Sequence, residues 1–367
     1  MNVLQLVNEG LAGGVLKVAI KQSESLERLG HKTFLITGFN IPYQDEFFGE
    51  RNFTFNTKIN IPLPRYILNY SGNLLAQFTG VIGKLKLPSG FKPDWIICHN
   101  LGPIYDAIKL KNTYNCNLAV MIHNPTIPPP YGFPHLSKML FNSVIHDKSY
   151  DILKNVDILL TTSENLRSYI NQIYKRNPTI IYPGCDPLPK LPSSRGNYVL
   201  CVQRLSIGKE TGKVAKAIAS VDRNVRVVFA GSMHWTTRKV LKDIKESGLK
   251  NYRIFTNVPW NILEELYTHC RFFISMTREV FFLPLLEAAS HGAPIIATAD
   301  VGASKLFSHG IQGFFFEGNE YVEYIKELLH DERKAWRMGY EAWKLCREKY
   351  TWTIHAKKLV DLLESVS

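Results

Sequence analysis

Several features are missing from this sequence of 367 residues. Its six cysteines are scattered and never form a Cys-x-x-Cys pair, which argues against a zinc site and favours buried, reduced thiols. There is no Asp-x-Asp triplet, so no metal-bridged diphosphate is indicated. No apolar run approaches the ~20 residues that cross a bilayer. The N-terminus also lacks the basic, apolar and cleavable segments of a signal peptide. We therefore expect a soluble, cytoplasmic protein.

Acidic residues are also scarce. The chain has 44 Lys and Arg against 32 Asp and Glu, a net charge of +12, and no acidic residue between Arg51 and Asp94. Such a balance indicates an anionic partner: nucleotide phosphates, nucleic acid or an anionic lipid surface. For the basic, aromatic stretch 52–93, a peripheral membrane contact and an ordinary solvated surface both stay open. Nucleic acid is the weaker alternative, because no compact recognition module is present.

What the sequence does contain is an alternation of strand-like and helix-like segments in two series. A stretch rich in proline and serine, Pro187–Gly196, separates the series and is the best domain boundary in the chain. This pattern predicts an α/β protein with two doubly wound, Rossmann-like domains facing across a cleft, residues 1–187 and 196–350. The expected strands are 3–7, 31–37, 94–98, 118–122, 158–162 and 179–182, then 198–202, 225–230, 252–255, 270–276, 293–298 and 310–316.

The second series carries the more specific candidate site. Arg204 and Lys209 flank its first strand-to-helix loop, where two cations could clamp a diphosphate. Later, Pro284 is placed to open a helix that Gly292 can close in a left-handed conformation. Glu279 precedes this helix and Glu287 lies within it. Near a helix N-terminus, two carboxylates could hold the hydroxyl groups of a sugar or ribose, although a solvated pair is the alternative.

The first series offers weaker candidates. Gly13 and Gly14 follow the first strand and would let the backbone approach a bound group closely, but they do not form a G-x-G-x-x-G motif. His99 and His123 each follow a strand, at the edge of a parallel sheet where ligands gather. We assign His99 a structural role. His123 is the better candidate because a long, proline-stiffened loop follows it.

These residues together resemble a known family. The chain is similar to the retaining GT-B glycosyltransferases of the family 4 type (glycosyl transferases group 1). The resemblance covers nearly the whole chain and rests on these motifs in order: Gly13-Gly14, Gly30-His31, Ile181–Asp186, Arg204-Leu205-x3-Lys209, Glu279-x7-Glu287 and Tyr350-Thr351-Trp352. The resemblance also implies that the last helix, about 351–367, crosses back onto the first domain. The first domain would then bind the acceptor and the second the nucleotide-sugar.

The resemblance implies a role for each residue. Glu287 would bind the ribose of a nucleotide-sugar, Glu279 would position the donor sugar, and Arg204 with Lys209 would hold the diphosphate and stabilise the leaving nucleotide. Gly13 and Gly14 would approach the phosphates. His123 would lie near the reacting centre. The loop of Phe282 and Leu283 would complete the donor site.

The resemblance further implies a hexosyltransferase-like enzyme of glycan or glycolipid biosynthesis that needs neither a cofactor nor a catalytic metal. A UDP- or GDP-sugar is the expected donor, and a glycan, a lipid-linked saccharide, a protein or a small molecule remains open as acceptor. Three alternatives stay open: a non-catalytic nucleotide-binding relative, a nucleic-acid-binding protein, and an enzyme of the same fold with other chemistry, such as a phosphorylase or an epimerase.

The chain also departs from the family pattern. Val280 and Phe282 replace the glycines of an E-G-F-G loop, and Phe282 is expected to narrow or reshape the sugar pocket. Glu210 stands where glycine is usual and adds a negative charge near the phosphate clamp.

Overall fold

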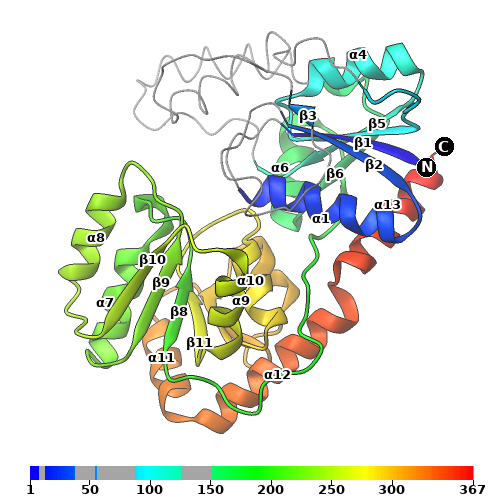
Figure 1. The fold of residues 1–367 in the computed structure, drawn as a ribbon. Coiled ribbons are helices and arrows are strands. Elements are labelled where there is room, and N and C mark those ends of the chain that lie inside the picture. Colours follow the sequence, from blue (N-terminus) through cyan, green and yellow to red (C-terminus); the bar gives the residue numbers. More distant parts are fainter. Residues whose placement is uncertain (8–12, 38–53, 56–86, 125–150, 367) are drawn as a thin grey trace. The chain divides into compact units, whose positions relative to one another are not determined.

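The computed structural model describes residues 1–7, 13–37, 54–55, 87–124 and 151–366. The chain divides into two compact units (Figure 1). Unit 1 comprises Met1–Pro183 together with Trp352–Ser367, and unit 2 comprises Gly184–Thr351. Both units are α/β structures, as the alternation of segments in the sequence predicts.

In its described residues, unit 1 contains a parallel sheet of seven strands in the order β3-β2-β1-β4-β5-β6-β7. Its strands are β1 (Asn2–Val7), β2 (Lys32–Thr37), β3 (Thr54–Phe55), β4 (Trp95–His99), β5 (Asn117–Ile122), β6 (Ile158–Thr161) and β7 (Thr179–Ile180). The helices among the described residues of unit 1 are α1 (Gly14–Arg28), α4 (Ile104–Tyr114), α6 (Glu164–Tyr174) and α13 (Trp352–Glu364). The strand order reverses between β1 and β4, so the loops after these strands flank the switch point of unit 1.

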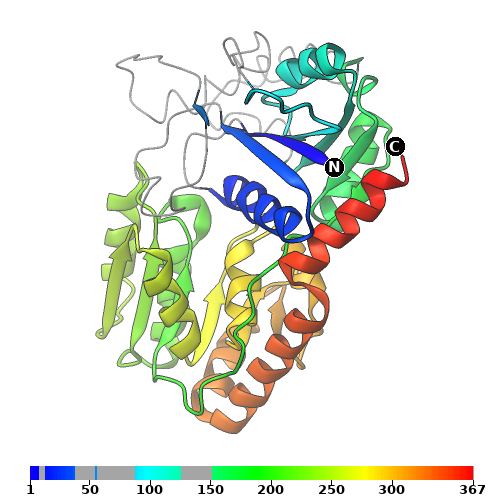
Figure 2. The same cartoon turned by 45° about the vertical axis from the view of Figure 1, so that its right-hand side comes forward.

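The last helix of the chain belongs to unit 1. Both views show α13 lying beside α1 (Figures 1 and 2), and buried Ala356 and Leu359 anchor it. The expected return of the C-terminal helix to the first domain is therefore confirmed.

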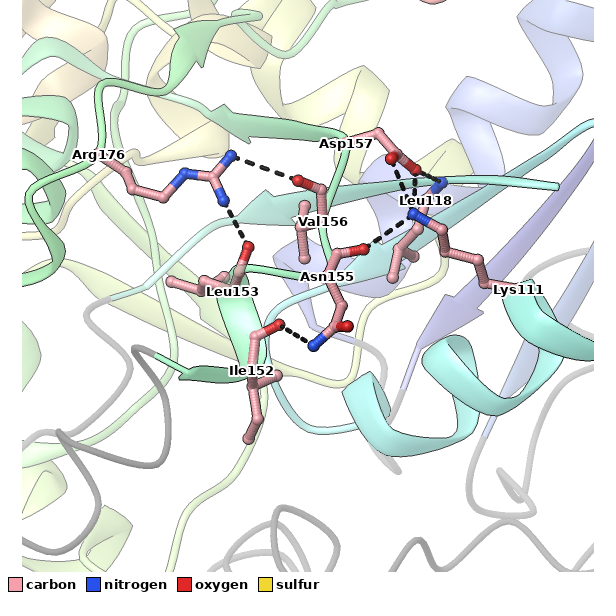
Figure 3. A network of polar contacts seen from close by, with 8 residues as sticks. All are labelled: Lys111, Leu118, Ile152, Leu153, Asn155, Val156, Asp157 and Arg176. Carbon is pink, nitrogen blue, oxygen red and sulfur yellow. Dashed lines mark hydrogen bonds and ion pairs between the residues drawn. The ribbon is translucent and has the colours of Figure 1, made fainter. Parts of the chain in front are cut away.

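A polar network holds together the edge of unit 1 where β5 and β6 begin (Figure 3). The ammonium group of Lys111 on α4 donates to both oxygens of Asp157, at 2.7 and 2.6 Å. One of these oxygens also accepts the backbone N–H of Leu118 at 2.7 Å. The guanidinium of Arg176 donates to the carbonyls of Leu153 and Val156. These contacts lie at the amino ends of the strands. They therefore stabilise the end of the sheet opposite to the carboxyl ends, where the switch-point loops begin.

Unit 2 contains a parallel sheet of six strands in the order β10-β9-β8-β11-β12-β13. The strands are β8 (Val199–Val202), β9 (Val227–Gly231), β10 (Tyr252–Thr256), β11 (Phe272–Ser275), β12 (Ile295–Thr298) and β13 (Gly313–Phe316). The helices are α7 (Thr211–Val221), α8 (Thr237–Lys245), α9 (Trp260–His269), α10 (Leu283–Ser290), α11 (Tyr321–His330) and α12 (Glu332–Lys349), with short 3-10 helices at Ile207–Lys209 and Gly302–Leu306.

Apolar side chains cover both faces of the unit 2 sheet. Along β11, Phe272 and Ile274 join the core beneath α7, whereas Phe273 points to the other face and contacts Tyr267 of α9 at 6.1 Å between ring centroids. Alternate residues of a strand point to opposite faces, so burial of both sets requires helices on both sides. This arrangement is doubly wound.

The stretch between the two series lies against unit 2. The partly buried Arg195 guanidinium donates to the carbonyls of Thr268, Cys270 and His291 at 3.3 to 3.4 Å, which joins the stretch to the end of α9 and to the end of α10. The indole N–H of Trp343 on α12 donates to Leu188 O at 2.8 Å. These contacts explain why a segment without regular secondary structure is grouped with unit 2.

The cysteines and the helices bear on two further expectations from the sequence. All six cysteines are free and buried, as predicted. Within the described ranges, none of the helices combines the length and the apolarity required to cross a bilayer. The candidate membrane-facing stretch 52–93 and the proline-rich loop 125–134 lie largely or wholly outside the described residues.

Candidate functional site

The candidate site of unit 2 lies at the switch point of its sheet. β8 pairs with β9 on one side and with β11 on the other, and the chain runs from β8 outward to β10 before it returns to β11. The loops after β8 and β11 therefore diverge from adjacent strand ends, which is where open α/β sheets bind ligands. The first loop carries Arg204 and Lys209, and the second carries Glu279.

Buried Gln203 fixes the conformation of the loop after β8. Its amide nitrogen donates to Lys209 O at 2.6 Å and to the Thr211 hydroxyl at 3.0 Å. Its amide oxygen accepts from the Ser275 hydroxyl at 2.9 Å, and Ser275 is the last residue of β11. Gln203 thus joins both loops of the site. A Cβ on Gly231 would lie 1.9 Å from Gln203 O, so only glycine permits this close approach of β9.

Lys209 and Glu279 form an ion pair across the two loops. Their side chains are 22% and 28% exposed, so both remain accessible to a ligand. Burial, and then the neighbouring positive charge of Arg204, lower the pKa of Lys209 to about 8. The Glu279 carboxylate acts in the opposite direction, because it stabilises the ammonium form. Arg204 is exposed, and no hydrogen bond or ion pair joins its side chain to another described residue. Two cations and one carboxylate therefore meet at this edge.

Glu210 has a left-handed backbone, with φ of 60° and ψ of 25°. It links the short helix Ile207–Lys209 to α7. A non-glycine residue in this conformation costs roughly 1–2 kcal/mol. This backbone explains why glycine is usual here in the family that the sequence resembles.

Helix α10 ends as the sequence predicts. Gly292 has φ of +75°. Its N–H donates to Ala289 O at 2.8 Å, and the N–H of Ala293 donates to Ala288 O at 2.9 Å. These two bonds form a Schellman motif. At the other end, Pro284 lies in the first turn, but the helix begins one residue earlier, at Leu283.

The side chains of Phe282 and Leu283 are buried. Phe282 is 3% exposed, and its ring lies 6.3 Å from that of Phe273 in the sheet. Because the ring belongs to the core, any influence of Phe282 on a bound sugar would act through its backbone. Pro284 lacks an N–H, and that of Leu285 donates to Phe282 O. The first turn of α10 therefore has few amides left for an anion, and the positive side chains carry most of the electrostatic attraction at this edge.

Glu287 lies on α10 with 9% of its surface exposed. The Tyr267 hydroxyl of α9 donates to Oε2 of Glu287 at 2.9 Å. Burial, together with the Glu287 charge, raises the pKa of Tyr267 well above its ordinary value, so the phenol remains a donor. A carboxylate held in this way is pre-oriented to accept hydrogen bonds from hydroxyl groups.

In unit 1, Gly13 is the N-cap of α1 and Gly14 is its first residue. Most of the loop before them lies outside the described residues. His123 follows β5 directly and is 6% exposed. Its ring Nε2 lies 2.9 Å from Nδ1 of His99, and its backbone N–H donates to Oδ1 of Asn100 at 2.8 Å. His99 is the last residue of β4, so the adjacent ends of two strands bring the histidines together.

Sequence reasoning did not identify Gln203, Ser275 or Tyr267. A polar residue that directly follows or ends a buried strand is a usable signal, and it would have indicated Gln203 and Ser275. Tyr267 gives no such signal, because its partner lies on another helix. No group of three or more His, Cys, Asp or Glu side chains that could hold a metal occurs in the parts of the chain that the structure describes.

Two doubly wound units, with the last helix returned to the first, define the GT-B class of fold. Family models agree with this assignment. Residues 12–187 match the model described as Glycosyltransferase Family 4, and residues 189–345 match that described as Glycosyl transferases group 1. The chain belongs to the GT-B glycosyltransferases of the family 4 type.

Curated relatives match only part of the chain. Sucrose synthase 4 of Oryza sativa subsp. japonica is 26% identical over 133 residues, which are 31% of this chain and 16% of that protein. Sucrose synthase of Denitrovibrio acetiphilus is 33% identical over 89 residues, which are 22% of this chain and 11% of that protein. The chain thus spans less than a fifth of the length of either relative.

Solved structures match over their whole length. HepE of Anabaena in complex with UDP has a TM-score of 0.75 and 16% identity, with full coverage of both chains. Sucrose-phosphate synthase from Thermosynechococcus elongatus has a TM-score of 0.77 and 16% identity, covering 100% of this chain and 99% of that one. At this identity the likeness establishes the fold alone.

Proposed function

We propose that this protein transfers a sugar from a nucleotide-sugar, with UDP as the expected nucleotide, to an acceptor hydroxyl. One observation carries the proposal: Arg204, Lys209 and Glu279 meet at the switch point of unit 2, on two loops that Gln203 joins. Two cations suit a diphosphate, whose charge increases as the sugar leaves. Complexes of the structural neighbour HepE with UDP and with UDP-glucose support the choice of donor.

In this proposal Arg204 and Lys209 bind the diphosphate and stabilise the leaving UDP. Lys209 exchanges its ion pair with Glu279 for a phosphate oxygen, and the released carboxylate accepts hydroxyl groups of the donor sugar. Glu287, held by Tyr267, accepts the ribose hydroxyls. The carboxylates therefore bind the hydroxyl groups of the sugar and the ribose, and the cations bind the diphosphate between them.

Unit 1 supplies the remaining proposed groups. Gly13 and Gly14 lie at the start of α1 and would present backbone N–H groups to phosphate oxygens. His123 would contact the substrate near the reacting carbon. We also propose retention of the anomeric configuration, which the resemblance to the family implies. Catalysis is proposed to proceed without a metal, because the sequence has no Asp-x-Asp and two cationic side chains can neutralise the diphosphate.

Calorimetric titration with UDP, GDP and ADP tests the site first. Wild-type protein is expected to bind UDP, and Arg204→Ala and Glu287→Ala are each expected to weaken binding at least tenfold. The matched control is Arg337→Ala, which removes an exposed arginine on α12 and should leave UDP binding unchanged. Unchanged UDP binding in both site variants would contradict the assignment.

The charge of Lys209 offers a sharper test. With a pKa of about 8, Lys209 loses most of its charge between pH 7 and pH 9, so UDP affinity should fall by up to about tenfold. Lys209→Arg keeps its charge over this range, and its affinity should change far less. Equal pH dependence in both proteins, together with unchanged UDP affinity of Lys209→Ala at pH 7, would show that Lys209 does not bind the diphosphate.

Turnover of a UDP-sugar, with NMR of the product, then tests the chemistry. The expected product keeps the anomeric configuration of the donor and forms at the same rate with EDTA present. UDP binding without turnover across a panel of sugars and acceptors would favour the non-catalytic relative.

A further inference from the structure

A continuous row of buried polar side chains in unit 1 connects His123 to the C-terminal helix. None is more than 6% exposed. The members are His123 after β5, His99 at the end of β4, Gln5 on β1, Gln22 on α1 and His355 on α13. Successive members lie 2.9, 2.8, 3.2 and 2.9 Å apart, and Nδ1 of His355 ends the row 2.8 Å from Tyr182 O.

The contact with Tyr182 determines in which direction the hydrogen bonds of the row are donated. A backbone carbonyl only accepts, so Nδ1 of His355 must carry a proton and donate it. Burial lowers the pKa of His355 to about 4, while the Tyr182 contact opposes this shift and Lys358 adds to it. The ring is therefore neutral at pH 7, and its Nε2 carries a lone pair.

That lone pair determines the orientation of Gln22. As drawn, Oε1 of Gln22 lies 2.9 Å from Nε2 of His355, so oxygens flank the ring on both sides and only a charged imidazolium could donate to both. A half-turn of the amide exchanges its oxygen and nitrogen without a change of shape. The neutral ring requires this orientation, in which Gln22 donates to His355.

The donor and acceptor roles of the other side chains in the row follow from the orientation of Gln22. As drawn, Gln5 Nε2 lies 2.6 Å from the Ser23 hydroxyl, and Gln5 Oε1 faces both Gln22 and Nε2 of His99. Once the Gln22 oxygen faces Gln5, the Gln5 amide must make the same half-turn. Its NH2 group then donates to Gln22 and to Nε2 of His99, and its oxygen accepts from the Ser23 hydroxyl. His99 then carries its proton on Nδ1 and donates to Nε2 of His123. The proton of His123 is left on Nδ1.

We propose that this row fixes His123 as the neutral tautomer protonated on Nδ1, with His99, Gln5, Gln22 and His355 as positioning residues. No described residue forms a hydrogen bond with Nδ1 of His123. His123 thus presents an N–H donor to an oxygen of the substrate and does not serve as a proton acceptor. The reverse direction would give His123 a lone pair at Nδ1, so the two directions predict opposite chemistry for one ring.

The tautomer can be observed directly. Two-bond 1H–15N correlation spectra of the full chain, labelled with 15N-histidine, report which ring nitrogen carries the proton. At pH 7 we expect His99, His123 and His355 to be neutral and protonated on Nδ1, with signals assigned by loss in His99→Gln, His123→Gln and His355→Phe. A proton on Nε2 of His123, a mixture of tautomers or an imidazolium at His355 in the wild-type protein would overturn the proposal.

Two variants test whether the row imposes this state. Gln22→Met and His355→Phe keep side-chain bulk but cut the link to Tyr182, so His123 should become a mixture of both tautomers. Leu359→Ala, a buried truncation on the same helix, should destabilise α13 but leave the tautomer unchanged. An unchanged Nδ1 tautomer in Gln22→Met would overturn the role of the row. The spectra need neither donor nor turnover, so their failure is separable from failure of the proposed transferase activity, on which the contact with substrate depends.

Discussion

Unit 1 buries three neutral histidines, so acid should destabilise this unit strongly. Burial lowers the pKa of His123 to about 3 and that of His355 to about 4, and burial together with the neighbouring His123 and His355 rings lowers the pKa of His99 well below its usual value. In the unfolded chain each ring has a pKa of about 6.5. Between pH 6.5 and the folded values, only the unfolded state binds these protons, so stability falls as the pH falls.

The magnitude follows from linkage. Between pH 7 and pH 5 each of the three rings is expected to lower the free energy of unfolding by about 2 kcal/mol, which gives about 5–6 kcal/mol in total. That is comparable to the whole free energy of unfolding of many domains. His31 adds to this effect, because partial burial, and then the N-terminal charge, also lower its pKa.

Native-state hydrogen exchange with mass spectrometry can separate the two units. Peptides from β1, β4 and β5 should lose about 10⁴-fold in protection from pH 7 to pH 5, after correction for intrinsic exchange, since 1.4 kcal/mol corresponds to tenfold. His355→Phe removes one titrating ring and should reduce this loss by roughly 30-fold. A loss worth less than about 2 kcal/mol in wild-type protein would refute the reasoning, because at least two rings would then have to be charged or exposed in the native state.

Three further substitutions test unit 2. Glu210→Gly should raise the free energy of unfolding by about 0.5–1 kcal/mol by relieving a left-handed backbone; urea titration measures this, and Glu210→Gln should show no gain. Tyr267→Phe should cost about 1–3 kcal/mol and weaken UDP binding by calorimetry, because Glu287 loses its donor. Gly339→Ala should cost about 1–3 kcal/mol in the same titration, because the added Cβ would lie 1.9 Å from Gly292 O; a neutral effect would contradict this close packing.

Local features of the fold could be predicted from the sequence. The left-handed Gly292 depends on residues within one or two helical turns and is confirmed. Helix-like segments are recognisable in the sequence at about 15–29, from 164, up to about 220, at 261–270, 284–292 and about 320–329, and at the C-terminal end, but α4, α8 and α12 are not among them. In α12 the buried face consists mainly of small residues, Ala335, Gly339 and Ala342, which give a weak apolar period.

The non-local parts of the site could not be predicted. The sequence indicates His123 as a candidate and assigns His99 a structural role, but it gives no sign that the two rings touch. Their row ends at His355, which is 333 positions from its partner Gln22. No pattern with the period of a helix or a strand connects residues so far apart. Only the sheet order and the return of α13 bring them together.

The departures from the family pattern are accommodated without loss of the charged groups. Glu210 adopts the left-handed backbone that favours glycine, at a cost of roughly 1–2 kcal/mol, and Gln203 still holds the loop. Phe282 places its ring in the core beside Phe273. Neither change displaces the Lys209 ion pair or the contact between Tyr267 and the α10 carboxylate. An inactive relative would be free to lose these buried and paired charges, which are costly to retain. Their presence therefore favours a working donor site over a scaffold.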